Sequence, residues 1–319
     1  MAYTGTGDVS SDTAAFQQLA YFAFRSQPMY DMIADVRSTA QTHNGASVQF
    51  NIYDNMAQAT SALTETSDVT AVALGDSTVV VTLAEYGNAV ITTAKLRGTS
   101  FLNVDADAAN IIGYNMVDSI DKLVSNVANA GTNVIYAQGS MGSRPTSRVG
   151  IADAATFGAQ EGRQAVAELR TASAPGFENG NYIGLVHPDV SYDLREQTAV
   201  TDVIQYQIRQ EGAAVRNGSI GVFGGIEWIE NPRAPILDDA GATGTTNVYQ
   251  TLVAGRQALA KAFSRAPGFG EDPSVVFGPV TDTLRRFHPV GWYHLVGHAI
   301  FRQAALQRIE SSSSIGDNT

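Results

Sequence analysis

The sequence VDADAANIIGYNMVDSIDKLVSNVANA, residues 104–130, has the clearest periodicity in this chain of 319 residues. Its apolar residues recur every three or four positions, which places them on one face of a helix. They are Ala109, Ile112, Met116, Ile120, Leu123 and Val127. Asp105 and Asp107 lie where a helix start favours negative charge, and Gly131 is a stop signal. The stretch predicts a helix about 38 Å long at 1.5 Å per residue, long enough to act as a strut.

Residues 1–45 predict an arm and not a domain. Ser11 or Asp12 can cap a first helix, and Pro28 opens a second amphipathic stretch that ends by Gly45. The large apolar and aromatic side chains of the arm are Phe16, Tyr21, Phe22, Phe24, Met29 and Tyr30. Two short helices offer these side chains little surface to pack on. We therefore expect the arm to pack against a surface outside itself.

From residue 48 the period changes to that of a β-strand. Residues 48–52 alternate apolar and polar side chains, and 69–74 and 78–83 predict two strands around the turn dipeptide Gly75-Asp76. Tyr86-Gly87 predicts a break before a further strand at 89–93. A β-ribbon with few large apolar groups is marginally stable alone, so we expect this region also to lean on a neighbour.

Residues 139–310 predict a mixed body, which makes the expected fold class α+β. A connector at 139–148 precedes a helix that Asp153 can cap and that runs to about Arg170. A buried strand at 182–186 ends at His187-Pro188-Asp189, where another helix begins. The remaining expected elements are a helix at 203–209, strands at 219–223, 226–230 and 248–253, a loop at 238–246, and strands within 291–310.

The composition excludes several classes of protein. The chain has no cysteine, which removes disulfides and thiol catalysis and fits a reducing cytoplasm. Its formal net charge of -11 argues against a basic surface that reads DNA. No uninterrupted apolar run of about 18 residues occurs, and nothing marks the chain for secretion or a membrane. Arginines outnumber lysines 17 to 3, which favours extensive subunit contact or reflects genomic base composition.

Three motifs could carry chemistry, and each has a simpler structural explanation. His294 and His298 have the spacing of zinc-protease ligands on a helix, but the general-base glutamate is absent and aromatic residues surround them. His187-Pro188-Asp189 has the composition of an ordinary junction between a strand and a helix. The glycines of residues 221–225 (GVFGG) fail the dinucleotide pattern and predict a tight turn. We therefore expect no enzyme activity, no cofactor and no metal.

The predicted order of arm, β-ribbon, long helix and α/β body resembles the HK-ninety-seven-like capsid fold of tailed bacteriophages. Local sequence is similar to one branch of that family, the major capsid proteins related to that of phage N-four. The matching stretches are Leu63-Thr64-Glu65, 79–87 (VVVTLAEYG), 182–195 (YIGLVHPDVSYDLR), 218–231 (GSIGVFGGIEWIEN), 248–255 (VYQTLVAG) and 292–311 (WYHLVGHAIFRQAALQRIES). Their order and spacing carry the resemblance, because no single stretch is an active-site signature.

The resemblance implies a division of the chain into segments. Residues 1–45 would be the N-terminal arm, 46–98 the E-loop with flanking strands, 99–139 the spine helix of the P-domain, 140–285 the A-domain, and 286–319 the strands that return to the P-domain. Arm and E-loop would each lie across neighbouring subunits. The expected contact residues are Phe16, Tyr21, Phe22, Phe24, Met29, Leu63, Val69 and Val72.

The resemblance also implies a function and partners. The chain would assemble with itself, as hexamers and pentamers, into an icosahedral virion head that encloses double-stranded DNA without sequence-specific binding. Assembly would take place in the cytoplasm of the host bacterium. We expect a separate scaffolding protein, a portal protein and no membrane. The shell would be held by overlap of arm and loop or by a separate cement protein. No lysine lies in 46–94, so the lysine-to-asparagine link of the best-known family member is not expected.

Two other functions remain open at this stage. A bacterial encapsulin has the same fold but encloses a protein cargo, so the contents of purified particles would distinguish it. A soluble metal-dependent hydrolase would use His294 and His298, and it would bind stoichiometric zinc as a monomer.

Overall fold

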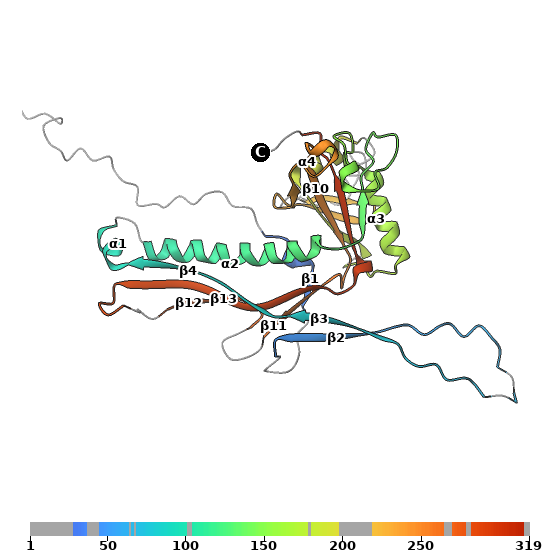
Figure 1. Cartoon of the computed structure of the whole chain (residues 1–319), viewed down its shortest axis with the longest axis horizontal. Helices are drawn as coiled ribbons and strands as arrows, with labels where there is room; N and C mark the ends of the chain where they lie inside the picture. Colours follow the sequence, from blue (N-terminus) through green and yellow to red (C-terminus); the bar gives the residue numbers. More distant parts are fainter. Residues whose placement is uncertain are drawn as a thin grey trace, which may run out of the picture. The chain divides into compact units, whose positions relative to one another are not determined.

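The computed structural model describes residues 28–36, 45–63, 65–66, 68–100, 104–177, 180–197, 219–264, 270–278 and 282–315. The chain folds as two compact units (Figure 1). The described part of unit 1 lies in Gly87–Met116 and Val275–Tyr293, and unit 2 comprises Ser26–Tyr86, Val117–Ser274 and His294–Thr319. The helices expected near residues 12–24 and at 203–209 lie outside the described residues.

Unit 2 is built on a seven-stranded sheet with the order β5-β14-β10-β6-β8-β7, in which β9 also pairs with β10. Its strands are β5 (Val134–Tyr136), β6 (Tyr182–Val186), β7 (Ser219–Phe223), β8 (Ile226–Glu230), β9 (Ile236–Leu237), β10 (Val248–Ala254) and β14 (Leu306–Ser311). Pairs β5–β14 and β6–β8 are parallel, whereas β10 is antiparallel to both of its neighbours. This confirms the strands predicted at 182–186, 219–223, 226–230 and 248–253, and the mixed α+β class.

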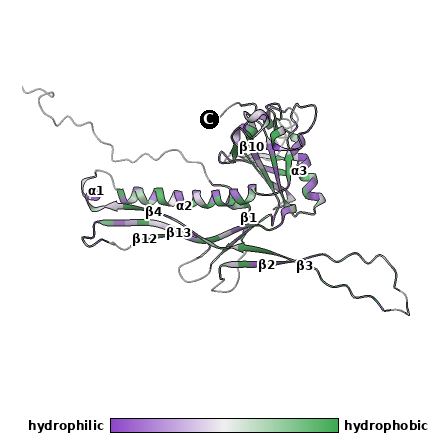
Figure 2. Cartoon of the chain, viewed as in Figure 1, coloured by the Kyte–Doolittle hydropathy of each residue, from purple (hydrophilic) through white to green (hydrophobic). Residues whose placement is uncertain are grey.

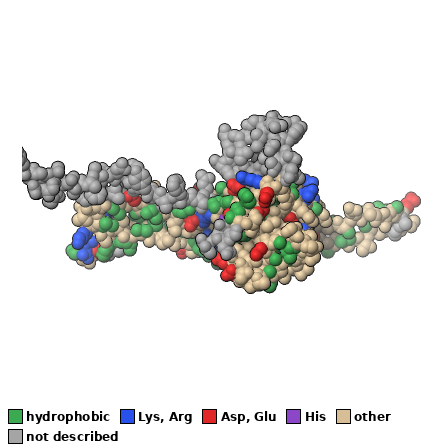
Figure 3. Space-filling view, turned by 90° about the horizontal axis from the view of Figure 1, so that it is seen from above, with side chains coloured by type: hydrophobic (Ala, Val, Ile, Leu, Met, Phe, Trp, Pro, Cys, Tyr) green, Lys and Arg blue, Asp and Glu red, His purple; other side chains and the backbone are tan. Residues whose placement is uncertain are grey.

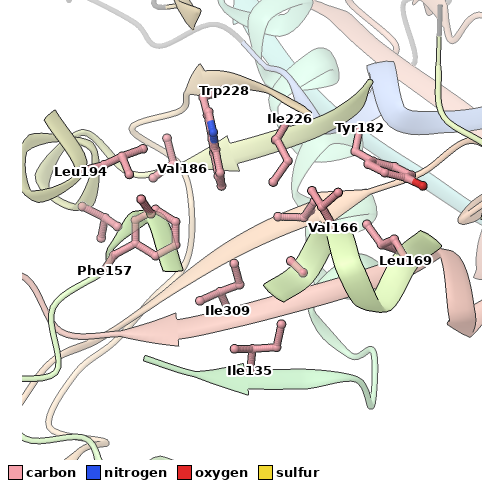
Figure 4. Close-up of a cluster of buried hydrophobic side chains, with 14 of the residues drawn as sticks. Ile135, Phe157, Val166, Leu169, Tyr182, Val186, Leu194, Ile226, Trp228 and Ile309 are labelled. Carbon is pink, nitrogen blue, oxygen red and sulfur yellow. The ribbon is translucent and has the colours of Figure 1, made fainter. Parts of the chain in front are cut away.

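The main core of unit 2 lies between this sheet and the helices α3 (Ala159–Thr171) and α4 (Pro188–Glu196). Figure 4 shows Val166 and Leu169 of α3 directed towards side chains of the sheet. The ring of Trp228 packs edge-on against Phe157, with centroids 5.5 Å apart. Both rings are almost fully buried, so this contact is part of the tightest packing in the unit.

The start of α3 differs from the prediction. Asp153 does not cap the helix, because its carboxylate accepts a hydrogen bond from the Thr246 hydroxyl at 2.6 Å. The helix begins after Gly158, whose N–H donates to the carboxylate of Glu161 at 3.1 Å. The N–H of Ala159 at the start of the helix donates to the amide oxygen of Gln197 at 2.9 Å, so Glu161 and Gln197 supply the acceptors expected from Asp153.

The long helix α2 (Val104–Asn129) confirms the strongest sequence prediction. Hydrophobic and hydrophilic residues recur along it (Figure 2), and Ile112, Ile120, Val124 and Ala128 are buried. At its end, the guanidinium of Arg308 donates to the carbonyls of Asn129 and Gly131. The last carbonyls of a helix have no partner within it, so this arginine stabilises the end of α2. No helix in the described ranges has the length and apolar character needed to cross a membrane.

The root of the arm is not the amphipathic helix predicted after Pro28. It is a single 3-10 turn, η2 (Tyr30–Ile33), followed by the strand β1 (Ala34–Val36). β1 pairs in parallel with β11 (Leu259–Phe263), from Ala34 opposite Leu259 to Val36 opposite Lys261. The prediction failed because the partner strand lies more than 200 residues further along the chain, where local periodicity gives no sign of it.

The strands predicted at 48–52 and 78–83 are confirmed, but they pair with each other in one long hairpin of unit 2 and not across a turn at Gly75-Asp76. β2 (Ser47–Tyr53) pairs antiparallel with β3 (Asp76–Thr82), from Ser47 opposite Thr82 to Tyr53 opposite Asp76. Residues 69–74 form no strand, and Figure 1 shows the chain running out from β2 and back to β3. We call residues 54–75 the hairpin loop.

Unit 1 contains most of β4 (Ala84–Thr93), the short helix α1 (Ala94–Thr99), the first half of α2, and strand β12 (Ser274–Phe277) with the first part of β13 (Phe287–Ile300). The break predicted at Tyr86-Gly87 does not occur, since β4 continues through it. A Cβ atom at Gly87 would lie 2.6 Å from the carbonyl oxygen of Trp292. Glycine is therefore used for close approach of two strands and not for a turn.

The sheets do not follow the expected segment boundaries everywhere. β5 lies within the segment expected as the spine and β14 within the returning segment, yet both belong to the seven-stranded sheet with β10. The strands predicted within 291–310 are confirmed as β13 and β14, separated by the 3-10 turn η6 (Gln303–Ala305). Two further 3-10 turns, η3 (Arg148–Gly150) and η5 (Ala242–Gly244), lie in the connector and in the loop predicted at 238–246.

Candidate assembly surfaces

The expected contact residues of the hairpin loop lie in the open. Every described residue from 54 to 75 is exposed. Leu63 is 76% exposed, Val69 61% and Val72 66%, and the neighbouring Leu74 is also 70% exposed. Large apolar side chains that are mostly exposed in one subunit are typical of a surface that another protein covers.

The base of the same hairpin is firmly packed. Val48 and Val81 are buried and contact Ala260 and Ala262 of β11. The rings of Phe50 and Phe301 meet edge-on with centroids 6.3 Å apart. The hairpin is thus anchored at one end and unsupported at the other, which fits a projection that reaches outward.

Close backbone approach strengthens this anchor. A Cβ atom at Gly297 of β13 would lie 2.3 Å from the carbonyl oxygen of Thr82 at the end of β3. Only glycine leaves room for β3 at this position.

The root of the arm is held by two carboxylates, whereas most of its predicted contact residues cannot be placed. Phe16, Tyr21, Phe22 and Phe24 lie outside the described residues, and Met29 is half-buried against the core of unit 2. The N–H of Tyr30 donates to buried Asp121 at 2.6 Å, and burial raises the pKa of that carboxyl. Asp31 accepts from the Lys261 ammonium at 2.9 Å. Tyr30 and Asp31, at the root of the arm, are therefore fixed to unit 2.

A second exposed surface, which the sequence did not predict, lies in unit 1. It combines α1 with the turn before β13, because the N–H of Ala94 donates to the carbonyl of Arg286 at 2.8 Å. We call it the basic tip, and its residues are Lys95, Leu96, Arg97, Leu284, Arg285, Arg286 and Phe287. Blue side chains gather at this end of unit 1 in Figure 3. The sequence offered two separate signals in an otherwise acidic chain: Lys95 with Arg97, and the adjacent Arg285 and Arg286.

The two histidines considered for a metal site lie on strand β13 and not on a helix, so the zinc-protease geometry does not form. The Nε2 atom of His294 lies 3.2 Å from the carbonyl oxygen of Gly270. Burial lowers the pKa of both imidazoles, that of His298 to about 4. His298 pairs across the sheet with Lys261, whose positive charge further disfavours protonation. No metal-binding group of three or more side chains occurs among the described residues.

The other two motifs also have structural roles. His187 caps α4, because its Nδ1 atom accepts from the N–H of Asp189 at 3.3 Å. The Asp189 carboxylate in turn accepts from the Tyr249 hydroxyl at 3.0 Å. Gly224 and Gly225, with φ angles of +65° and +86°, form the turn between β7 and β8 as predicted. A strand follows this turn, so the phosphate-binding helix start of a dinucleotide site is missing.

Comparisons with known proteins agree with the sequence resemblance. The model of the family described as phage capsid protein matches residues 6–310. The fold is similar to the capsid of Ralstonia phage GP4, with 14% identity, 100% of both chains covered and a TM-score of 0.77. It is also similar to the capsid of cyanophage Pam1, with 13% identity, 99% of both chains covered and a TM-score of 0.73.

A third similar structure is the acid-stable capsid of Helicobacter pylori bacteriophage KHP30. It has 12% identity and a TM-score of 0.73, over 98% of this chain and 99% of that one. At these identities the likeness shows the HK-ninety-seven-like fold alone. No curated protein sequence matches significantly.

Proposed function

Since the chain belongs to the phage capsid protein family, we propose that it is the major subunit of an icosahedral tailed-phage head. Hexamers and pentamers of this subunit enclose double-stranded DNA, and the protein catalyses no reaction. The observation that carries the proposal is the hairpin loop, whose described residues are all exposed although several are large and apolar. Burying these side chains against a neighbouring subunit contributes about 25 cal/mol per Å² of apolar surface.

In this assembly the segments take the roles implied by the resemblance. The arm (1–45) and the hairpin loop of the E-loop segment (46–98) lie over neighbouring subunits, with Phe16, Tyr21, Phe22, Phe24, Leu63, Val69 and Val72 in the contacts. Met29, also expected in these contacts, is half-buried in its own subunit. The spine helix (99–139), the A-domain (140–285) and the returning strands (286–319) form the body. The packing of the hairpin base supports this division. Because the base is fixed to its own subunit, the hairpin loop can bind a neighbouring subunit without destabilising the fold from which it extends.

The shell is held without covalent links between subunits. No lysine lies in residues 46–94, so the hairpin has no amine to join to an asparagine, and the one lysine of the segment 46–98, Lys95, lies in helix α1. Mature particles boiled in sodium dodecyl sulfate should give a single band at the mass of the subunit. A ladder of linked species would contradict this proposal.

The partners are those of a virion protein assembled in the bacterial cytoplasm. A separate scaffolding protein guides assembly, a portal protein occupies one vertex, and a cement protein reinforces the shell. The net charge of -11 supports a wall along which packaged DNA slides, because phosphates are repelled and counterions take up the charge.

Electron microscopy of the purified full-length chain, produced with the other head proteins of its phage, tests the proposal. Closed shells that contain DNA and carry tails are the expected result. Shells that contain a protein cargo and no tail would show an encapsulin instead. A chain that stays monomeric under these conditions would refute a shell function.

A further inference from the structure

Four side chains that can carry charge meet at the root of the arm in unit 2. They are Asp31 of η2, Lys261 of β11, and His294 and His298 of β13. We propose that His298 and Lys261 form an acid-sensitive latch on the root of the arm. A proton taken up by His298 breaks the tie between Asp31 and Lys261 and frees β1 from β11, while the rest of the subunit stays folded.

The register of the sheet places these groups together. Lys261 lies directly opposite His298 in the pairing of β11 with β13, so the two side chains share one face of the sheet. His294 lies on the same face, because residues four apart on a strand point the same way. The Lys261 ammonium donates to both carboxylate oxygens of Asp31, at 3.0 and 2.9 Å. Asp272, in the chain between β11 and β12, acts electrostatically on His294.

At neutral pH the charges of the latch balance. Lys261 and Asp31 carry opposite charges, and both imidazoles are neutral because burial lowers their pKa values. The Nε2 atom of His298 is buried and has no hydrogen-bond partner among the described residues. Lys261 is 7% exposed, so its ammonium depends on the Asp31 carboxylate for compensation. The closed latch therefore has no net charge.

A proton on His298 removes this balance. The imidazolium lies across one strand pair from the Lys261 ammonium, and like charges that face each other in this way destabilise a strand pair. One carboxylate, that of Asp31, then compensates two cations in a place with little water. Protonation of His294 would add a third cation and no relief. Acid therefore disfavours the closed latch.

β1 is the element that can leave at the least cost. It has only three residues and lies at the end of the described strand order β1-β11-β13-β12, with Val36 40% exposed. β11, in contrast, lies between two strands and packs against the base of the hairpin. Departure of β1 lets water reach the Lys261 ammonium, which can then turn away from the imidazolium. Tyr30 and Ile33 are buried in the core of unit 2, so the opening ends at the turn before β1.

The latch acts on the segment that joins the arm to the hairpin. Two carboxylates hold the root of the arm, and acid removes only the tie through Asp31. The N–H of Tyr30 can still donate to Asp121, because a carboxyl oxygen accepts in either protonation state. The effect on particles rests on the proposed shell function: both segments lie over neighbouring subunits there, so a loose β1 weakens their hold.

Hydrogen–deuterium exchange of the purified full-length chain tests the latch at pH 7 and pH 4.5. Mass spectrometry follows the peptide that contains residues 31–36. Exchange is compared with that of the unfolded chain at the same pH, which removes the intrinsic effect of pH. The variants are His298→Asn and Lys261→Met. The matched control is His288→Asn, which makes the same replacement earlier on β13, in unit 1.

In the wild type, β1 should open at least about tenfold more often at pH 4.5 than at pH 7. A pKa of about 4 in the closed latch, against 6.5 for a hydrated imidazole, sets an upper bound of about 50-fold. His288→Asn should show the same increase as the wild type. His298→Asn should show none, because its amide takes up no proton. Lys261→Met should show a smaller increase from a higher starting level, because its imidazolium meets a carboxylate and no ammonium.

Three results would overturn the inference. Equal increases in the wild type and in His298→Asn would mean that the proton acts elsewhere. An undiminished increase in Lys261→Met would mean that repulsion between two cations does not drive opening. Exchange of the seven-stranded sheet together with β1 would mean that acid unfolds the whole subunit. Circular dichroism at pH 7 checks the folding of each variant, and His298→Gln takes the place of His298→Asn if the latter does not fold.

The outcomes also separate the latch from the shell function. Exchange is measured on the purified chain, so the latch is tested whether or not the chain forms particles. Failure of the wild type to form particles would refute the shell function and leave the latch intact. Particles built from a chain whose β1 stays closed in acid would refute only the latch.

Discussion

The seven-stranded sheet and the hairpin loop place valine and leucine in opposite surroundings. In β10 all seven residues are buried, whereas every described residue of the hairpin loop is exposed. Both regions contain apolar side chains, so hydrophobicity alone does not decide which of them contributes to the stability of one subunit. The sheet is complete within the chain, whereas in the proposed shell the loop is covered only by another subunit. Stability of the fold and stability of the assembly are therefore encoded in separate regions, and substitutions should affect one without the other.

The largest loss of folding stability is expected from Trp228→Ala in the sheet. Trp228 is 1% exposed and packs on Phe157, so truncation leaves a cavity and costs about 4 kcal/mol. Denaturant unfolding of the wild-type subunit and of Trp228→Ala measures the difference between their free energies of unfolding. Tyr192→Ala, at a position 53% exposed on α4, is the matched control and should cost less than about 1 kcal/mol. Equal losses from both substitutions would contradict the assignment of the core.

Glu310→Gln is expected to cost about 3 kcal/mol of folding stability, because it leaves buried arginine charge uncompensated. Glu310 is fully buried in β14. Burial by itself raises the pKa of its carboxyl, but hydrogen bonding to Arg148 and the charges of Arg308 and Arg148 outweigh it and lower the pKa. The Arg148 guanidinium donates to both carboxylate oxygens, at 2.6 and 2.9 Å. An unchanged melting temperature in the variant would show that the ion pair adds nothing.

Acid should weaken the subunit through His298. Its folded pKa of about 4 lies below the value of 6.5 in an unfolded chain, so the unfolded state binds the proton first. The stability supplied by the neutral imidazole is complete above pH 6.5 and is lost as the pH falls towards 4. We expect the wild type to lose about 2 kcal/mol more than His298→Asn between pH 7 and 4.5. If the free energies of unfolding of the wild type and of His298→Asn fall equally between pH 7 and 4.5, His298 is not the source of the acid sensitivity.

The smallest effect on folding is expected from Leu63→Ser with Val72→Ser in the hairpin loop. Both side chains are more than half exposed, so the free energy of unfolding should change by less than about 0.5 kcal/mol. Particle assembly should nevertheless fall, since the surface that a neighbour covers has become polar. Measuring the free energy of unfolding and the yield of particles for the same variant separates the contribution of the loop to folding from its contribution to assembly. A large loss of subunit stability would mean that the loop belongs to its own fold.

The sequence predicted best those elements whose signals are local. The helix α2 has regular apolar spacing, acidic residues at its start and a glycine after its end, and the structure begins and ends it within a residue of the prediction. The turn at Gly224-Gly225 was equally clear. In these places neighbouring residues suffice to fix the conformation.

The elements that failed depend on distant partners. β1 was predicted as a helix because Met29, Met32, Ile33 and Val36 have helical spacing, and its partner β11 cannot be seen from nearby residues. Residues 69–74 have strand composition, but no described strand of the same chain pairs with them. The basic tip escaped notice because Lys95 and Arg285 are far apart in sequence and meet only when Ala94 bonds to Arg286.

The position of β14 between β5 and β10 has a consequence for synthesis of the protein. A chain still on the ribosome that has been made only as far as residue 300 lacks the strand that joins β5 to the rest of the sheet. Two strand edges then stay open, and the buried face of β10 has no complete cover. Prematurely terminated chains would be unable to finish this sheet, so cellular proteases would remove them before they entered a shell.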